Sequence, residues 1–288
     1  MESRRAAPGS DAAAAAAKNH ITTSVIVPAF RENANLRPLA TRLFKAFADP
    51  ASPIAPSTVE LVVVDDNSRD GSVETVAALQ REGLQVRIVV RTTERGLSSA
   101  VMRGFHEAKG EVLVCMDADL QHPPEFVPAL AAKVRSAQNP AGKPFVLGTR
   151  YAPGVSMDKD WPLHRRVISS GARMLARPLT VASDPMSGFF GLSRDLLDRA
   201  KNVDQHGFKI ALDLLVKTGV PAAGIGEHAF SFGLRTEGES KLSSKVILRY
   251  LQQLFELYVY QYGLGFYLAL LLLMLAALFV LHMLLQAL

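Results

Sequence analysis

Short apolar runs alternate with helix-like segments through the first half of this 288-residue sequence. Each run contains several consecutive branched apolar residues, and each intervening segment repeats apolar residues at helical spacing. A strand that is apolar on both faces needs helices on both faces, which is typical of parallel sheets. The alternation therefore predicts an α/β domain whose mostly parallel sheet is wound by helices. The runs are TTSVIVPAF (22–30), VELVVVDDNS (59–68), VRIVV (86–90) and EVLVCMDAD (111–119).

Composition divides the chain into regions and limits its partners. Hydrophobic residues make up 49% of the sequence, which is enough for a sizeable core. Residues 1–20 are rich in alanine and lack the apolar segment of a secretory signal, so we expect a disordered tail before a main domain over 21–240. The net charge of +5 fits an anionic partner, but no zinc-finger or ribonucleoprotein motif is present, so nucleic acid is not expected. Cys115 is the only cysteine, and we interpret it as a small buried hydrophobe.

The C-terminal region over 261–288 predicts a single transmembrane anchor. Residues 263–281 form about 19 uncharged, mostly apolar positions, or roughly 28 Å of helix, which is close to the hydrocarbon thickness of a bilayer. A buried soluble helix is the alternative. Lys241, Lys245 and Arg249 precede this stretch and nothing basic follows it, which predicts that the main domain lies on the cytoplasmic side.

The segment 241–260 predicts an amphipathic helix between the main domain and the anchor. We expect this helix to lie along the membrane surface, and the alternative is an ordinary helix packed on the domain. Its apolar face is formed by Ile247, Leu251, Phe255 and Tyr258, with Lys245 and Arg249 on another side.

Two carboxylates one residue apart follow the apolar run that ends near Cys115. Side chains alternate along an extended chain, so Asp117 and Asp119 are expected on one face at the carboxyl end of a strand, where open α/β sheets bind ligands. Clustered carboxylates repel each other unless a cation joins them, and oxygen ligands suit Mg²⁺ or Mn²⁺. The amide of Gln121 completes the expected metal site. The alternative is an acidic cap between a strand and a loop.

Further polar groups are expected at the ends of neighbouring strands. Glu32 follows the first strand, where it either accepts hydrogen bonds from a nucleoside or begins a helix. The pair Asp65 and Asp66 follows the second strand and points to binding, whereas the adjoining NSRDGS segment is turn and cap chemistry. A scattered basic set follows, with surface solvation or ion pairing as the alternative for its arginines: Arg150, Arg165, Arg235 and Lys241.

The remaining titratable groups are less informative. Asp184 and Asp213 each adjoin an expected helix, and they either cap it or line a pocket. The histidines show no metal-ligand spacing, and we interpret them as ordinary surface or core residues: His106, His122, His164, His206 and His228.

These motifs in this order resemble the family of inverting nucleotide-sugar glycosyltransferases with the A-type, Rossmann-like fold, and within it the branch that mannosylates dolichyl phosphate. The resemblance extends from about Thr22 to the end of the chain. It includes the single-polypeptide arrangement, in which the catalytic domain and the membrane span share one chain, so no obligatory protein subunit is expected. The motifs are VIVPAFRENANL, VDDNSRDGS, MDADLQHPPE, LGTRY, RRVISSGA, SDPMSGFFGL, GFKIALDLL and LRTEGESKL.

The resemblance implies a role for each motif residue. The donor nucleotide-sugar site would contain Pro28, Phe30, Glu32, Asp65, Asp117, Ala118, Asp119, Arg235 and Lys241. The divalent metal would be held by Asp117, Asp119 and Gln121, and the acceptor lipid phosphate by Arg150, Arg165 and Ser169. Asp119, Arg150 and Arg165 are the expected catalytic residues.

The reaction implied is transfer of mannose from GDP-mannose to dolichyl phosphate with inversion, which supplies a lipid-linked mannose donor for N-glycosylation, O-mannosylation and GPI-anchor synthesis. The implied setting is the endoplasmic reticulum membrane, with the catalytic domain facing the cytoplasm. A lipid monophosphate is largely dianionic at neutral pH, so no protein base is expected. The alternatives are a dolichyl-phosphate glucosyltransferase that uses UDP-glucose, and a non-catalytic, membrane-tethered nucleotide-sugar binding scaffold.

Overall fold

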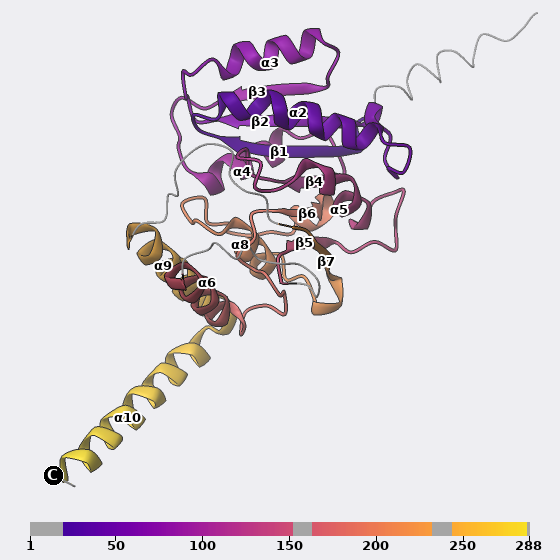
Figure 1. Cartoon of the computed structure of the whole chain (residues 1–288). Coiled ribbons are helices and arrows are strands. Elements are labelled where there is room, and N and C mark those ends of the chain that lie inside the picture. Colours follow the sequence, from indigo (N-terminus) through magenta and orange to yellow (C-terminus); the bar gives the residue numbers. More distant parts are fainter. Residues whose placement is uncertain (1–19, 152–162, 232–243, 287–288) are drawn as a thin grey trace, which may run out of the picture.

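The computed structural model describes residues 20–151, 163–231 and 244–286, and these form a sheet covered by helices on both faces (Figure 1). Within the described residues the sheet has seven strands in the order β3-β2-β1-β4-β6-β5-β7. All neighbouring strands are parallel except that β6 runs antiparallel to both β4 and β5. The strands are β1 (Thr23–Ala29), β2 (Val59–Asp65), β3 (Val86–Val90), β4 (Val112–Cys115), β5 (Phe145–Thr149), β6 (Phe190–Ser193) and β7 (Ile225–Ala229). The predicted, mostly parallel sheet wound by helices is thereby confirmed.

Seven helices lie between the strands along the described part of the chain. They are α2 (Asn33–Ala48), α3 (Ser72–Arg81), α4 (Leu97–Glu107), α5 (Val127–Lys133), α6 (Leu163–Ala176), α7 (Arg194–Leu197) and α8 (Ile210–Lys217). Three short 3-10 helices are also described: η1 (Pro56–Thr58), η2 (Pro124–Phe126) and η3 (Ala222–Gly224). Two long helices follow at the C-terminus, α9 (Ser244–Tyr262) and α10 (Leu264–Gln286). Among the seven, α6 packs beside α9 rather than on the sheet (Figure 1).

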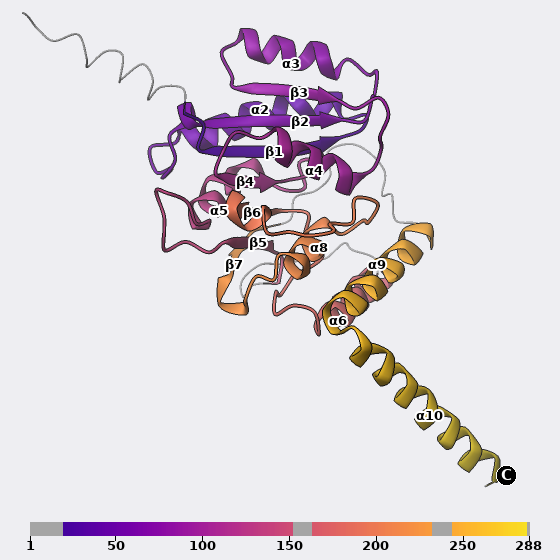
Figure 2. The same cartoon turned by 180° about the vertical axis from the view of Figure 1, so that it is seen from behind.

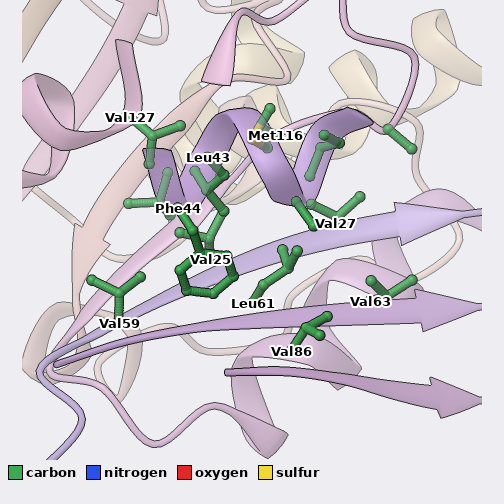
Figure 3. Close-up of a cluster of buried hydrophobic side chains, with 14 of the residues drawn as sticks. Val25, Val27, Leu43, Phe44, Val59, Leu61, Val63, Val86, Met116 and Val127 are labelled. Atoms are coloured by element: carbon green, nitrogen blue, oxygen red, sulfur yellow. The ribbon is translucent and has the colours of Figure 1, made fainter. Parts of the chain in front are cut away.

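Each central strand contributes side chains to two cores. Val25 and Val27 of β1 pack against α2, as Figure 3 shows, together with Leu43 and Phe44 of that helix. Ile26, between them, points to the opposite face and packs with residues of α4 and α8. This alternation is why the strands read as continuous apolar runs, because both faces are covered. Burial of Cys115 in the second core confirms its interpretation as a hydrophobe.

Helix α9 packs beside α6, and α10 extends away from the body of the molecule (Figure 2). The buried face of α9 contains Tyr250, Leu254 and Leu257, which form a third apolar cluster with α6 and α8. The hydroxyl groups of Tyr250 and Tyr258 donate hydrogen bonds to backbone carbonyls of Ala172 and Leu175, at 2.7 and 2.8 Å. The packed alternative for this segment therefore holds for one face of α9, whereas the opposite face exposes Leu248, Leu251 and Phe255.

The predicted C-terminal helix is present as α10, and it begins after a sharp break at Gly263. That residue has φ of +50°, a left-handed conformation that glycine adopts without a steric cost. Within the described residues no single helix is both long and apolar enough to cross a bilayer. One bent pair, Val246–Tyr262 with Leu264–Val280 at 115°, meets that criterion together. The transmembrane anchor therefore stays a prediction.

Candidate functional site

The sequence motifs that follow β1, β2 and β4 meet at one edge of the sheet. The strands are parallel, with Ala29 opposite Asp65 and Ile26 opposite Cys115. Backbone hydrogen bonds continue this alignment past the strand ends, because the amide of Asp66 donates to Ala29 and that of Met116 donates to Ile26, both at 3.1 Å. The motifs that follow these strands therefore lie at the same edge of the sheet, as predicted, whereas their role as a site stays a prediction.

The Asp-Ala-Asp segment itself is a turn rather than the end of a strand. Strand β4 ends at Cys115, so the argument that Asp117 and Asp119 share a face by strand alternation was wrong. The reason is local: the Asp119 carboxylate accepts a hydrogen bond from the Gln121 amide at 3.1 Å, and Leu120 has φ of +63°. Asp117 keeps a side chain that is 41% exposed, whereas Asp119 is buried. Ala118 between them is buried as well.

A buried histidine and a glycine shape the environment of Asp117. The Asp117 amide donates to Nδ1 of His122 at 3.0 Å, and the imidazole stacks on Phe189 with ring centroids 5.4 Å apart. Burial lowers the pKa of His122, although the charges of Asp117 and Asp119 oppose that shift. A Cβ on Gly188 would lie 3.3 Å from Oδ1 of Asp117 and 3.3 Å from His122, so a larger residue there would press on both side chains. The burial of His122 agrees with its interpretation as a core residue, but no spacing in the sequence marks its contact with Asp117.

The donor groups near Asp117 fit a hard divalent cation that is shared with a diphosphate. Among the described residues no three His, Cys, Asp or Glu side chains are grouped for metal binding. Two carboxylates with the adjacent Gln121 amide nevertheless form an all-oxygen set, which is the chemistry that Mg²⁺ and Mn²⁺ prefer. Mg²⁺ is commonly held by one or two carboxylates while substrate phosphates provide further ligands.

Residues after β1 and β2 form the part of the edge expected to bind a nucleoside. Phe30 is partly exposed, and the guanidinium groups of Arg31 and Arg95 lie 5.3 and 5.7 Å from its ring centroid. Glu32 accepts a hydrogen bond from the side chain of Asn35 at 2.8 Å. Pro28, at the end of β1, is partly exposed.

The two aspartates after β2 have different roles. Asp65 accepts a hydrogen bond from the Ser68 amide at 2.8 Å, and its other oxygen accepts one from the Ser68 hydroxyl. Asp66 is buried and forms an ion pair with buried Arg91, and it also accepts from the Gly96 amide at 2.9 Å. Asp66 therefore holds the loop before α4, and the role of the pair in binding stays a prediction.

A buried ion pair lies beside this edge at the end of β5. Arg150 binds Asp184 in a bidentate arrangement, with Nε 2.7 Å from Oδ2 and the other nitrogen 2.9 Å from Oδ1. The Asp184 side chain is 1% exposed and that of Arg150 is 12% exposed. Burial lowers the pKa of Arg150, but the hydrogen bonds and charge of Asp184 outweigh that effect and raise it. Asp184 thus orients Arg150, while Asp213 instead pairs with Lys217 at 3.0 Å.

The Arg150 side chain lines a cavity of about 410 Å³ between α6, α9 and the segment before α8. This volume lies in the range of small-molecule binding sites. Its walls are largely apolar, and its polar side chains include Arg150, Ser169 and Lys209. The hydroxyl group of Ser169 lies 3.3 Å from that of Tyr151. The apolar lining includes Ile168, Ala172, Leu175, Met186, Val246, Ile247 and Leu251.

The structure therefore brings two of the three predicted acceptor residues, Arg150 and Ser169, to one cavity. Arg165 lies in α6, but its side chain is outside what the structure describes. Arg235 and Lys241 lie outside the described residues altogether. Lys209 was missed by the sequence reasoning, because a lysine before an apolar helical segment is not a distinctive signal.

Comparisons with known proteins identify the family. The model of "Glycosyl transferase family 2" matches residues 24–200. A dolichol-phosphate mannosyltransferase of Mycosarcoma maydis is 66% identical over 83% of this chain and 80% of its own length. The enzyme of that name from Saccharomyces cerevisiae is 60% identical over 84% of this chain and 89% of its own length.

A solved structure shows the same fold. It is glucosyl-3-phosphoglycerate synthase from Mycobacterium tuberculosis in complex with Mn²⁺, uridine diphosphate and glucosyl-3-phosphoglycerate, with a TM-score of 0.58 and 20% identity. The match covers 90% of this chain and 86% of the other. The fold, the carboxylate edge and the high identities agree, and the chain belongs to glycosyl transferase family 2, among its dolichol-phosphate mannosyltransferases.

Proposed function

We propose that this protein transfers mannose from GDP-mannose to dolichyl phosphate with inversion, and so makes a lipid-linked mannose donor. One observation supports this most strongly: the carboxylate edge and the apolar cavity are adjacent. Asp117 lies beside Gly188, two residues after Met186 of the cavity wall, and its charge acts on Arg150 and Lys209, the cationic side chains among the described lining residues. A sugar diphosphate bound at the edge and a lipid phosphate bound in the cavity would then meet where the edge and the cavity adjoin. The names of the relatives at 66% and 60% identity agree with this reaction.

The carboxylate edge is proposed as the donor site. Asp117, Asp119 and Gln121 would hold Mg²⁺ or Mn²⁺, which supplies neutralisation of the diphosphate that leaves. Pro28, Phe30, Glu32 and Asp65 would contact the guanosine, consistent with their places after β1 and β2. Ala118 would add backbone contacts, and Arg235 and Lys241 would cover the diphosphate. The solved relative of the same fold was crystallised with Mn²⁺ and a nucleoside diphosphate, which supports a metal-assisted donor site.

The cavity is proposed as the acceptor site. Arg150 would position the lipid phosphate, because its guanidinium is held rigidly by Asp184 at the polar end of the cavity. Arg165 and Ser169 would contribute from α6. A phosphate whose second pKa is near 6 is largely dianionic at neutral pH, so its oxygen attacks the anomeric carbon without a protein base. Attack from the side opposite the leaving diphosphate inverts an α-linked donor to a β-linked product.

The C-terminal helices are proposed to keep the site at a membrane. The exposed face of α9 carries Leu248, Leu251 and Phe255, and α10 is apolar over most of its length. A polyprenyl chain stays in the bilayer, so an enzyme that holds its phosphate gains from being tethered beside it. We propose the endoplasmic reticulum membrane as its location, with the catalytic domain facing the cytoplasm.

The test is sugar transfer by the purified protein in liposomes that contain dolichyl phosphate. Labelled GDP-mannose and labelled UDP-glucose are offered separately, each with Mg²⁺, with Mn²⁺ and with a chelator. We expect a lipid product from GDP-mannose alone that is lost with the chelator. A product from UDP-glucose would assign the glucosyl reaction instead, and binding of a donor without a product from either would indicate a scaffold.

A further inference from the structure

We propose that Lys209 binds the phosphate of the acceptor and that Gln253 of α9 is the positioning residue that holds it there. This inference rests on the proposed function, because it adds a phosphate contact and its support to the same acceptor cavity. Lys209 lies in the GFKIALDLL motif, but the family resemblance assigns a role neither to it nor to Gln253.

The ammonium group of Lys209 lies in the cavity wall and forms no ion pair within the described part of the chain. Its only described hydrogen bond goes to the carbonyl oxygen of Met186, at 3.2 Å. The ammonium also lies 5.2 Å from the ring centroid of Phe208, and both side chains line the cavity. Arg150, in contrast, is neutralised by a bidentate carboxylate. The pair Arg150 and Asp184 is close to neutral as a unit, so among the described residues that line the cavity Lys209 is the cation without a hydrogen-bonded carboxylate.

A net positive charge in a largely apolar cavity is costly unless an anion binds there. Burial lowers the pKa of Lys209, and the charge of Arg150 lowers it further, while Asp117 and Asp184 oppose that shift. A phosphate dianion would reverse the balance by giving the ammonium a counter-charge. The apolar remainder of the cavity suits a hydrocarbon chain attached to that phosphate. The chemistry therefore favours a lipid phosphate over a free sugar phosphate.

Gln253 fixes the backbone that carries Lys209. It is 2% exposed, and its Oε1 accepts hydrogen bonds from the amides of both Phe208 and Lys209 at 3.1 Å. Its Nε2 donates to the carbonyl of Lys209 at 3.4 Å. One side chain thus forms hydrogen bonds with both the backbone N–H and the backbone carbonyl of Lys209. Gln252, the neighbour on α9, is exposed and contacts only Glu256, at 3.2 Å, among the described residues.

Gln253 lies in α9, the helix that also lines the cavity, so its hydrogen bonds connect that helix to Lys209. Helix α9 also contributes Val246, Ile247 and Tyr250 to the cavity and continues into α10. Gln253 therefore ties the helix that we propose to lie at the membrane to the lysine that we propose to bind the lipid headgroup. The cavity and its cation keep a fixed relation as long as this side chain is present.

The first experiment measures binding without catalysis. Calorimetry of the full chain in detergent compares a short-chain prenyl monophosphate with the corresponding prenol, for the wild type, Lys209→Gln and Lys209→Met. Lys201→Gln is the matched control, because Lys201 is exposed. We expect the wild type to prefer the phosphate, both Lys209 variants to lose roughly 10-fold or more of that preference, and the control to keep it. A preference for the phosphate that survives in the folded Lys209 variants would overturn the proposal.

The second experiment separates positioning from mere stability. Gln253→Met removes all three hydrogen bonds, Gln253→Glu keeps an acceptor for both amides, and Gln252→Met is the control on the same helix. We expect Gln253→Met to raise the KM for dolichyl phosphate several-fold with the donor KM within about twofold, and Gln253→Glu to recover part of the loss. Equal changes in both KM values, or none in the acceptor KM, would remove the positioning role. Phosphate-selective binding without mannose transfer would contradict the proposed function alone.

Discussion

The substitution Asp184→Asn tests how the cavity holds its arginine. The change keeps the size of the side chain but removes the charge that faces Arg150, whose side chain is only 12% exposed. Breaking a buried ion pair from one side costs about 3–5 kcal/mol, because the remaining charge is left in a poorly solvated place. Asparagine still offers one acceptor oxygen, so we expect the lower end, about 3 kcal/mol. For a domain of this size that loss corresponds to a decrease in Tm of roughly 6–12 °C.

The assay is thermal unfolding of the purified protein in detergent, with and without a prenyl monophosphate. A bound phosphate would restore a counter-charge to Arg150, so the ligand should raise the Tm of Asp184→Asn more than that of the wild type. The double variant Arg150→Met with Asp184→Leu should recover much of the lost stability, because no buried charge is left unpaired. A Tm of Asp184→Asn within about 2 °C of the wild type, or additive effects in the double variant, would refute this reasoning.

Three further predictions address the edge of the sheet and the core. Asp119→Asn should lower mannose transfer by roughly 100-fold or more with an unchanged circular dichroism spectrum, and titration with Mn²⁺ should not restore the rate; full activity would remove Asp119 from the metal site. Gly188→Ala places a methyl group against Asp117 and should raise the Mn²⁺ concentration for half-maximal activity by roughly 10-fold, whereas an unchanged metal requirement would show that the neighbours shift aside.

The third concerns Glu60, which is buried at the opposite end of β2. Burial alone would raise its pKa, but hydrogen bonds from Ser24, Arg87 and the Lys109 amide hold that pKa below its usual range. The stability from the ionised form is therefore present above about pH 4.3 and is lost as the pH falls through the lowered pKa. Denaturant unfolding of Glu60→Gln should show a deficit of about 2 kcal/mol at pH 7 that shrinks below pH 4, and a deficit independent of pH would contradict the assignment.

The sheet could be predicted from the sequence because its signal is local. Val25, Ile26 and Val27 are consecutive and are buried on alternate faces of β1. This pattern is typical of a strand that is covered by helices on both faces. The alignment of Asp65 and Asp117 at one edge follows from parallel pairing alone. The end of β4 was misplaced because the turn at Leu120 depends on a side-chain hydrogen bond to a backbone amide, which the apolar pattern does not encode.

The acceptor side of the site was less predictable, because its contacts join distant parts of the chain. The sequence allows Asp184 either to cap a helix or to line a pocket, and the structure pairs it with Arg150 instead. Lys209 and Gln253 depend on how α9 returns to the segment before α8, and no spacing in the sequence reports that packing. Arg150 and Ser169 were identified through the family resemblance rather than through any local pattern.

The most direct test of the account is a structure of the protein with GDP, Mn²⁺ and a non-reactive prenyl phosphate analogue. The account predicts the metal on Asp117 and Asp119, the lipid phosphate within hydrogen-bond distance of Arg150, and the first part of the chain in the cavity between α6 and α9. A lipid phosphate bound elsewhere, with that cavity filled only by protein or detergent, would contradict the claim that the carboxylate edge and the cavity form one transfer site.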